Sequence, residues 1–249
     1  MRAFFSSNAM FSPAWWLILV ASLALSALTL RLGFWQLGRA QYKESLHAQQ
    51  VAQRARAPLH TADVLQPSDA ADHVHRAVQV QGEWVGAATV FLANRTMQGK
   101  VGFWVLTPLR LRGDEAVLVV RGWAPRDVIS SDRLPPVQTP SGAVQVQGHW
   151  EAPPSQMLEL AHTTPQSASG FAPLRQNVDL SSLARETGLQ LLGTVWQIGP
   201  PSEGLWRDWP PILTGADKNR AYALQWFALS ALSAGLFIWF QIFRKRRHG

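Results

Sequence analysis

The residues of this 249-residue chain that could do chemistry gather beside two apolar segments rather than in a catalytic motif. Four recur every four residues and are expected on one face of a helix: Arg31, Trp35, Arg39 and Lys43. Arg220 stands at the start of the second apolar segment. Such cations either anchor anionic lipid headgroups or bind an anionic cofactor, for which Arg31, Arg39 and Arg220 are the candidates.

The other polar residues form no catalytic pattern. Serines and histidines are scattered, and no Gly-x-Ser-x-Gly turn is present. His73 and His75 could share a strand face and bind zinc or copper, but an exposed loop flanked by aspartate is the interpretation we favour. The chain has no cysteine, which excludes thiolate ligands and disulfides, and it has no glycine-rich phosphate loop. We therefore expect neither an enzyme nor a metal site.

The net charge of +7 belongs to the ends of the chain. Residues 40–217 hold 14 of the 23 basic residues and all 16 acidic ones, so the middle is slightly acidic. The excess lies beside the apolar segments and in the tail Arg244–Arg247. This distribution indicates membrane topology, and we expect no nucleic acid as partner.

The first apolar segment covers residues 14–35. Residues 14–30 carry no charge, and with residues 32–35 the segment is about as long as the 20 residues that a bilayer core requires. Trp15 and Trp16 are placed as interfacial anchors, and an amphipathic run continues beyond residue 35. We expect an uncleaved transmembrane helix that extends past the membrane until Pro58 ends it.

The second apolar segment, residues 221–243, carries no charge and is followed at once by four cations. Cations at a helix end favour the cytoplasmic side. We therefore expect cytoplasmic residues 1–13 and 244–249, spans 14–35 and 221–243, and a periplasmic domain of residues 36–220 in a bacterial inner membrane.

The middle of the chain has the period of strands rather than of helices. Residues 76–85 alternate between valine and polar residues, and residues 87–95 are predicted to be their hairpin partner. Residues 101–111 and 116–125 form two more β-type runs, a short helix is expected at residues 180–186, and residues 193–201 are predicted as the last strand. We predict a membrane α+β protein with an antiparallel β-barrel or sandwich between its two helices.

A short motif occurs twice in this domain. Residues 78–84 read VQVQGEW and residues 144–150 read VQVQGHW. Two interpretations stay open: duplication of a small β unit, or two half-exposed strands that each end in a glycine bulge and an aromatic residue. The differing flanks favour the second.

Four segments in this order resemble the Surfeit locus protein 1 family, whose members assist cytochrome c oxidase assembly. They read GFWQLGRAQYKE (33–44), LANRTMQGKVGFWVLTPLRL (92–111), VLVVRGWAPRD (117–127) and AYALQWFALSA (221–231). The resemblance implies an assembly factor that helps to insert haem a into the catalytic subunit of a haem-copper oxidase or stabilises that subunit. It also implies contacts with other assembly factors and the lipid bilayer.

The resemblance suggests roles for particular residues. Haem a is the implied cofactor, held by a histidine three residues before the tyrosine that matches Tyr222, but this chain has Asn219 there. Arg31, Arg39 and Arg220 are the candidates for propionate contact. The candidates for partner contact or packing are Trp35, Gln36, Arg39, Asn94, Arg95, Gly102, Arg121, Gly122, Trp123, Tyr222 and Trp226.

Two other functions fit a two-span layout. A scaffold such as a regulator of polysaccharide chain length would need long coiled-coil helices between the spans, and no sustained heptad occurs there. A membrane enzyme that modifies haem would need histidines inside the spans, which have none.

Overall fold

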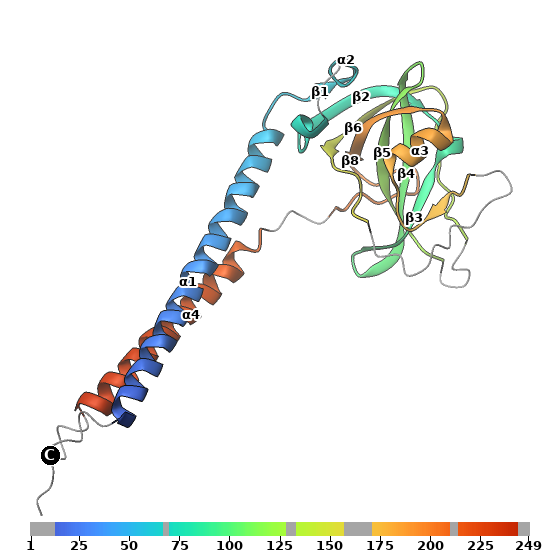
Figure 1. Cartoon of the computed structure of the whole chain (residues 1–249). Helices are drawn as coiled ribbons and strands as arrows, with labels where there is room; N and C mark the ends of the chain where they lie inside the picture. Colours follow the sequence, from blue (N-terminus) through green and yellow to red (C-terminus); the bar gives the residue numbers. More distant parts are fainter. Residues whose placement is uncertain (1–12, 67–69, 128–132, 157–170, 210–213, 244–249) are drawn as a thin grey trace, which may run out of the picture. The chain divides into compact units, whose positions relative to one another are not determined.

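The computed structural model describes residues 13–66, 70–127, 133–156, 171–209 and 214–243. They belong to two compact units: Met1–Ala48 with Ile212–Gly249, and Gln49–Pro211. The first unit is helical and the second contains the sheet, so the predicted combination of two apolar helices with a β domain is confirmed (Figure 1).

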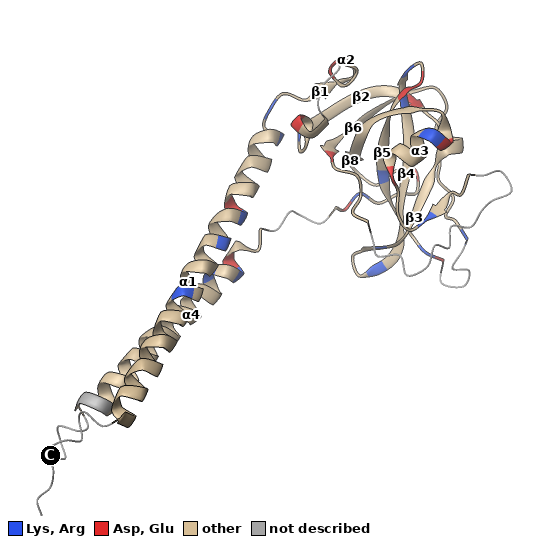
Figure 2. Ribbon diagram, viewed as in Figure 1, with Lys and Arg blue, Asp and Glu red and all other residues tan. Residues whose placement is uncertain are grey.

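Two helices make up the first unit. α1 spans Pro13–Arg54, of which residues 49–54 belong to the second unit, and α4 spans Ala216–Ile238, with the π-helix η4 at Trp239–Phe243. Both helices are long and apolar enough to cross a membrane. Much of the length of each carries no charge (Figure 2), and α1 continues well beyond Trp35, as its amphipathic run predicts.

α1 and α4 run antiparallel and approach closely at small residues. A Cβ atom on Gly33 would lie 2.4 Å from the ring of Phe227, so a larger residue would require that ring to move. Farther along, the Ser26 and Ser230 hydroxyls each donate to the backbone carbonyl oxygen of the other residue, at 3.5 and 2.9 Å. Close backbone approach at small residues, with hydroxyl groups between helices, is typical of helix packing in membranes.

The second unit is a closed barrel. Its long strands are β2 (Ala77–Trp84), β3 (Val90–Met97), β4 (Lys100–Arg112), β5 (Glu115–Pro125), β6 (Ala143–Glu151) and β8 (Gln190–Gln197). Short elements are β1 (Leu59–His60), α2 (Thr61–Val64), η2 (Ala70–His73), η3 (Gly86–Ala88), β7 (Leu174–Arg175) and α3 (Leu180–Thr187). The order is β1-β2-β6-β8-β5-β4-β3-β7, and a further pairing of β2 with β4 closes a ring of five strands.

The predicted hairpin between residues 76–85 and 87–95 is wrong. β2 and β3 both pair with β4, β3 along its first half and β2 at Leu109 and Arg110. The turn η3 therefore carries the chain along one edge of β4 rather than reversing it. The predicted runs 101–111 and 116–125 do form an antiparallel pair, β4 with β5.

The barrel is not wholly antiparallel. β5 pairs in parallel with β8, which follows β5 only after β6, β7 and α3. α3 has the Asp179 side chain as its N-cap acceptor for the Ser182 amide and ends at Gly188 in the left-handed region. The long return through α3 provides the crossover that a parallel pair requires.

The repeated motif forms two neighbouring strands. β2 and β6 pair antiparallel with Val80 opposite Val146, so the two copies lie side by side in opposite directions. No bulge occurs at either glycine. Instead, a Cβ on Gly82 or Gly148 would lie 2.2 or 2.3 Å from a backbone oxygen of the next strand, which explains why both copies carry glycine.

Alternate residues of these strands fill the barrel. Val80, Leu109, Val119, Val146 and Val195 are among the residues of one buried cluster. A second cluster, which includes Leu106, Val120 and Leu183, joins the other face of the sheet to α3. Most of the regular secondary structure described between α1 and α4 is strand, which does not match the coiled coil of the scaffold alternative.

Candidate functional site

The helical unit contains a polar contact between its two helices. Nδ2 of Asn219 donates to Oε1 of Gln36 at 2.6 Å, and Nζ of Lys43 donates to Oδ1 of Asn219 at 2.8 Å. We call these three residues the interhelical network. Both polar groups of the Asn219 side chain are thus used to hold α4 against α1.

The candidate cations do not share one face. Each step of four residues turns a helix about 40° beyond a full turn, so Lys43 is about 120° from Arg31. Arg31 and Arg39 are exposed, whereas Lys43 contacts α4 through the interhelical network. Arg39 also lies over the ring of Tyr42 at 5.5 Å.

Arg220 is held by acidic neighbours. Its Nη2 lies 2.7 Å from Oε1 of Glu44 on α1, and its Nη1 lies 3.6 Å from Oδ1 of Asp217. The charge of Arg220 is therefore compensated within the helical unit, and its guanidinium is a weaker candidate for binding an anion than the exposed Arg31 and Arg39.

The aromatic candidates of this unit lie on its surface. Trp35 is 61% exposed and Tyr222 is 54% exposed. Trp226 is half-buried and lines an apolar groove between the two helices. Exposed aromatic residues of this size near the ends of the apolar lengths suit either the bilayer interface or a protein partner.

In the barrel, Trp123 contacts two other candidate residues. Its indole nitrogen donates to the carbonyl oxygen of Arg95 at 2.8 Å, and the side chain is fully buried. A Cβ on Gly102 would lie 2.5 Å from the same ring. Arg95, Gly102 and Trp123 therefore form one packed contact across β3, β4 and β5.

The guanidinium of Arg95 is also enclosed. It lies over Trp104 at 4.8 Å, and its Nη2 donates to the carbonyl oxygens of Gln176 and Ser155 at 2.9 and 3.2 Å. Burial lowers the pKa of Arg95 from its ordinary value. The neighbouring Asn94 is exposed, with φ 59° beside the irregular pairing of β3 with β4, a conformation that asparagine tolerates well.

Arg121 belongs to a different contact. It is fully buried over Trp84, and its Nη2 lies 2.8 Å from Oε2 of Glu203 and 2.6 Å from the Gln138 carbonyl oxygen. Arg207 reaches the same Glu203 oxygen at 3.3 Å. Burial and the charge of Arg121 lower the pKa of Arg207, and Glu203 opposes them.

Gly122 is required beside this cluster. A Cβ there would lie 2.7 Å from Leu205 and 2.9 Å from the Trp206 carbonyl oxygen, on the segment that also supplies Glu203 and Arg207. The segment after β8 is thereby held against β5. These contacts enclose Arg121 and Gly122 within the second unit.

Sequence reasoning missed the acceptors of these contacts. Glu203 belongs to no motif, because it bonds Arg121, which is 82 positions away; Gln36 is among the predicted candidates, but its bond to Asn219, 183 positions away, is not predicted. The left-handed backbone at Glu203 and Gly204 marks a turn, but a turn does not identify the partner of a side chain.

The histidines do not converge. His73 ends η2, and His75 has φ 73° with its Nδ1 2.7 Å from Oε2 of Glu151, so the two do not alternate on a strand. Among the residues that the structure describes, no three His, Cys, Asp or Glu side chains are arranged to hold a metal ion.

The helical unit does not fit axial ligation of haem iron at position 219. An amide is not a usual haem ligand, and both polar groups of Asn219 are already bonded to α1. His47, the one histidine in the described part of this unit, lies 11 residues along α1 from Gln36, about 16 Å.

Comparison with known proteins gives matches over almost the whole chain. The model of the SURF1 family matches residues 23–231. A SURF1-like protein of Monosiga brevicollis is 25% identical over 92% of this chain and 88% of that protein. A SURF1-like protein of Drosophila melanogaster is 26% identical over 94% and 79%. The cytochrome oxidase assembly protein SHY1 of Saccharomyces cerevisiae is 26% identical over 47% of this chain and 30% of its own length.

Proposed function

The chain belongs to the SURF1 family, the Surfeit locus protein 1 family that its motifs resemble, and from this premise we propose that it assists cytochrome c oxidase assembly. The observation that carries the proposal is the extent of the family match, which begins inside α1 and ends inside α4. It includes the barrel and the interhelical network. A relative that matches part of the chain is named as a cytochrome oxidase assembly protein.

The proposed client is the catalytic subunit of a haem-copper oxidase, together with other assembly factors. The protein stabilises that subunit while haem a is inserted, and it does not itself supply the axial ligand. We propose no axial ligand from this protein because the Asn219 side chain already forms hydrogen bonds with Gln36 and Lys43. The barrel contacts of Arg95, Arg121 and Trp123 are internal, so these residues act by maintaining shape rather than by chemistry.

We assign the exposed candidates to contact with partners or lipid. Arg31, Trp35, Arg39 and Tyr222 project from the helical unit. Their position at the ends of the apolar lengths places them near the headgroups once α1 and α4 cross a bilayer. An anionic group of the client, including a haem propionate, would meet Arg31 or Arg39 before the neutralised Arg220.

The proposed location is a bacterial inner membrane. α1 and α4 cross the bilayer, the barrel lies in the periplasm, and both termini are cytoplasmic. The four cations of residues 244–247 support this orientation, because short segments rich in Lys and Arg stay on the cytoplasmic side.

Deletion of the gene tests the function. We expect the membranes to lose most of the visible absorbance of haem a while the catalytic apoprotein is still detected by immunoblot. Normal oxidase spectra in the deletion strain would overturn the proposal. The visible spectrum of the protein, purified in detergent after expression with haem a synthesis, tests the cofactor role: no stoichiometric haem is expected, and a full complement of bound haem would contradict it.

A further inference from the structure

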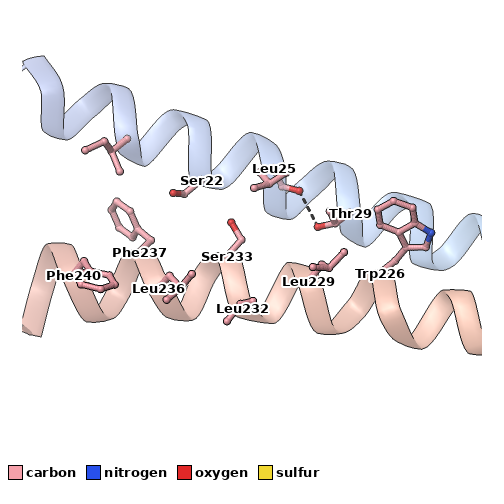
Figure 3. A pocket seen from close by; sticks show the side chains of 11 residues that line it. Ser22, Leu25, Thr29, Trp226, Leu229, Leu232, Ser233, Leu236, Phe237 and Phe240 are labelled. Carbon is pink, nitrogen blue, oxygen red and sulfur yellow. Dashed lines mark hydrogen bonds between the residues drawn. The ribbon is translucent and has the colours of Figure 1, made fainter.

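A groove runs along one side of the contact between α1 and α4. Its volume is about 470 Å³, and apolar side chains from both helices line it, including Leu25, Leu229, Leu236 and Phe240. Figure 3 shows two serine hydroxyls, those of Ser22 and Ser233, directed into the space between the helices. The groove is therefore apolar with a polar spot inside it.

These two hydroxyls differ from the others on the same helix faces. Thr29 donates to the Leu25 carbonyl oxygen at 2.8 Å, and Ser26 and Ser230 donate across the helix contact. Ser22 and Ser233 make no hydrogen bond within the part of the chain that the structure describes. The groove thus contains one hydroxyl that its own helix satisfies and two that nothing satisfies.

Both serines lie deep in the apolar length of their helix. Ser22 is 8 residues after Ala14, about 12 Å along α1, and Ser233 is 12 residues after Ala221, about 18 Å along α4. In a hydrocarbon core about 30 Å thick, neither position reaches water or headgroups. A hydroxyl at this depth is stabilised by a partner, either the carbonyl oxygen four residues earlier on its own helix or a hydrogen-bonding group that the occupant of the groove brings to it.

Lipid and a second copy of the chain both fit poorly. An acyl chain has no donor or acceptor at mid-depth. A second copy would bring its own Ser22 and Ser233 to the same depth, so hydrogen bonding alone does not exclude it. Two copies that faced each other would, however, set one groove against another, which leaves space rather than filling it.

We propose that this groove binds a transmembrane helix of the client, one that carries an amide or hydroxyl side chain at mid-depth. The proposal rests on the proposed function, which makes the client the catalytic subunit of the oxidase. Ser22 and Ser233 select the register of the bound helix, and the surrounding leucine and phenylalanine side chains supply packing. Interhelical hydrogen bonds combined with close packing are the interactions that associate helices in lipid.

The test is photocrosslinking in cells that make the oxidase. A benzophenone amino acid replaces Leu232, which lines the groove, or Leu224, which is exposed on α4 outside it. The full chain is expected to crosslink to the catalytic subunit from position 232 and not from position 224. Replacing both serines (S22A with S233A) should lower the yield about fivefold to tenfold, and Leu229→Trp, which fills the groove, should abolish it.

The matched control is Thr29→Val, which removes the hydroxyl that is already satisfied within α1. It should leave the yield unchanged. An adduct to lipid alone, to a second copy of the chain or to a different protein would overturn the proposal, as would a yield that the double serine variant does not change. The deletion strain distinguishes failure of the groove proposal from failure of the proposed function. If the deletion strain loses its oxidase while the groove variants crosslink normally, only the groove proposal is refuted.

Discussion

The indole nitrogen of Trp123 on β5 donates to the carbonyl oxygen of Arg95 on β3, across the intervening strand β4. The ring passes over Gly102, which is paired with Arg95 on one side and Pro125 on the other. One side chain therefore ties together three strands whose sequences carry the motifs of the family.

This relationship predicts that Gly102→Ala destabilises the barrel. The new Cβ would meet the Ala124 carbonyl oxygen at 2.2 Å and the Trp123 ring at 2.5 Å, so strand and ring must move apart. We expect a loss of about 1–3 kcal/mol in the free energy of unfolding, measured by tryptophan fluorescence of the full chain in detergent. Gly38→Ala on α1, where a Cβ meets nothing within 4 Å, is the control and should not destabilise. Equal stability of the two variants would contradict the prediction.

Glu203→Gln is predicted to be much more harmful than an exposed counterpart. Glu203 is the carboxylate shared by the buried Arg121 and Arg207, and its loss leaves two cations without compensation. We expect about 2–4 kcal/mol of destabilisation in the same unfolding experiment. Glu115→Gln, which breaks a more exposed pair with Arg112, should cost about 1 kcal/mol or less. The prediction fails if the two changes cost the same.

The interhelical network can be tested by a double-mutant cycle. Asn219→Ala and Gln36→Ala each remove the bond between these side chains, so their effects on stability should not add. A coupling of about 0.5–2 kcal/mol is expected in thermal unfolding of the detergent-solubilised chain. Gln225→Ala serves as the control, since Gln225 is exposed on α4 and should show no coupling to Gln36. Additive effects at positions 36 and 219 would refute the contact.

The barrel should become less stable as the solution becomes mildly acidic. Burial lowers the pKa of His149 below its ordinary value of 6.5, and Arg54 and His75 lower it further, while Glu151 opposes them. The unfolded chain therefore binds a proton at this site more readily than the folded chain, so stability falls as the pH drops below about 6.5. His149→Gln should flatten that part of the curve of unfolding free energy against pH. The exposed His60→Gln should leave the curve as it is, and an unchanged slope in His149→Gln would count against the assignment.

The sequence predicts the elements better than their pairing. Long runs without charge identify both apolar helices, and β-type runs separated by a turn identify β4 and β5, because these signals are local. The pairing of β2 with β6 and the parallel pairing of β5 with β8 are not local. Alternation along a strand tells which residues face the core, but not which strand lies beside it.

For the candidate residues, too, the sequence does not tell which residues lie beside them in space. Trp123 and Gly102 are predicted among the candidates for packing or partner contact, and the structure places the Trp123 ring over Gly102, whereas their role in function stays a prediction. Charge alone does not separate Arg39, which is exposed, from Arg121, which is buried, because the difference lies in whether an acceptor such as Glu203 is nearby in space. Lys43 joins the helix contact because a spacing of four residues drifts around a helix.

Closure of the ring has a consequence for recognition. Each of its five strands is paired with another ring strand on both sides, so a peptide cannot extend this part of the sheet by adding itself as a new strand. A partner that adds itself as a strand would find an open edge only outside the ring, on β1, β3 or β7, so the ring itself is recognised by side chains and loops.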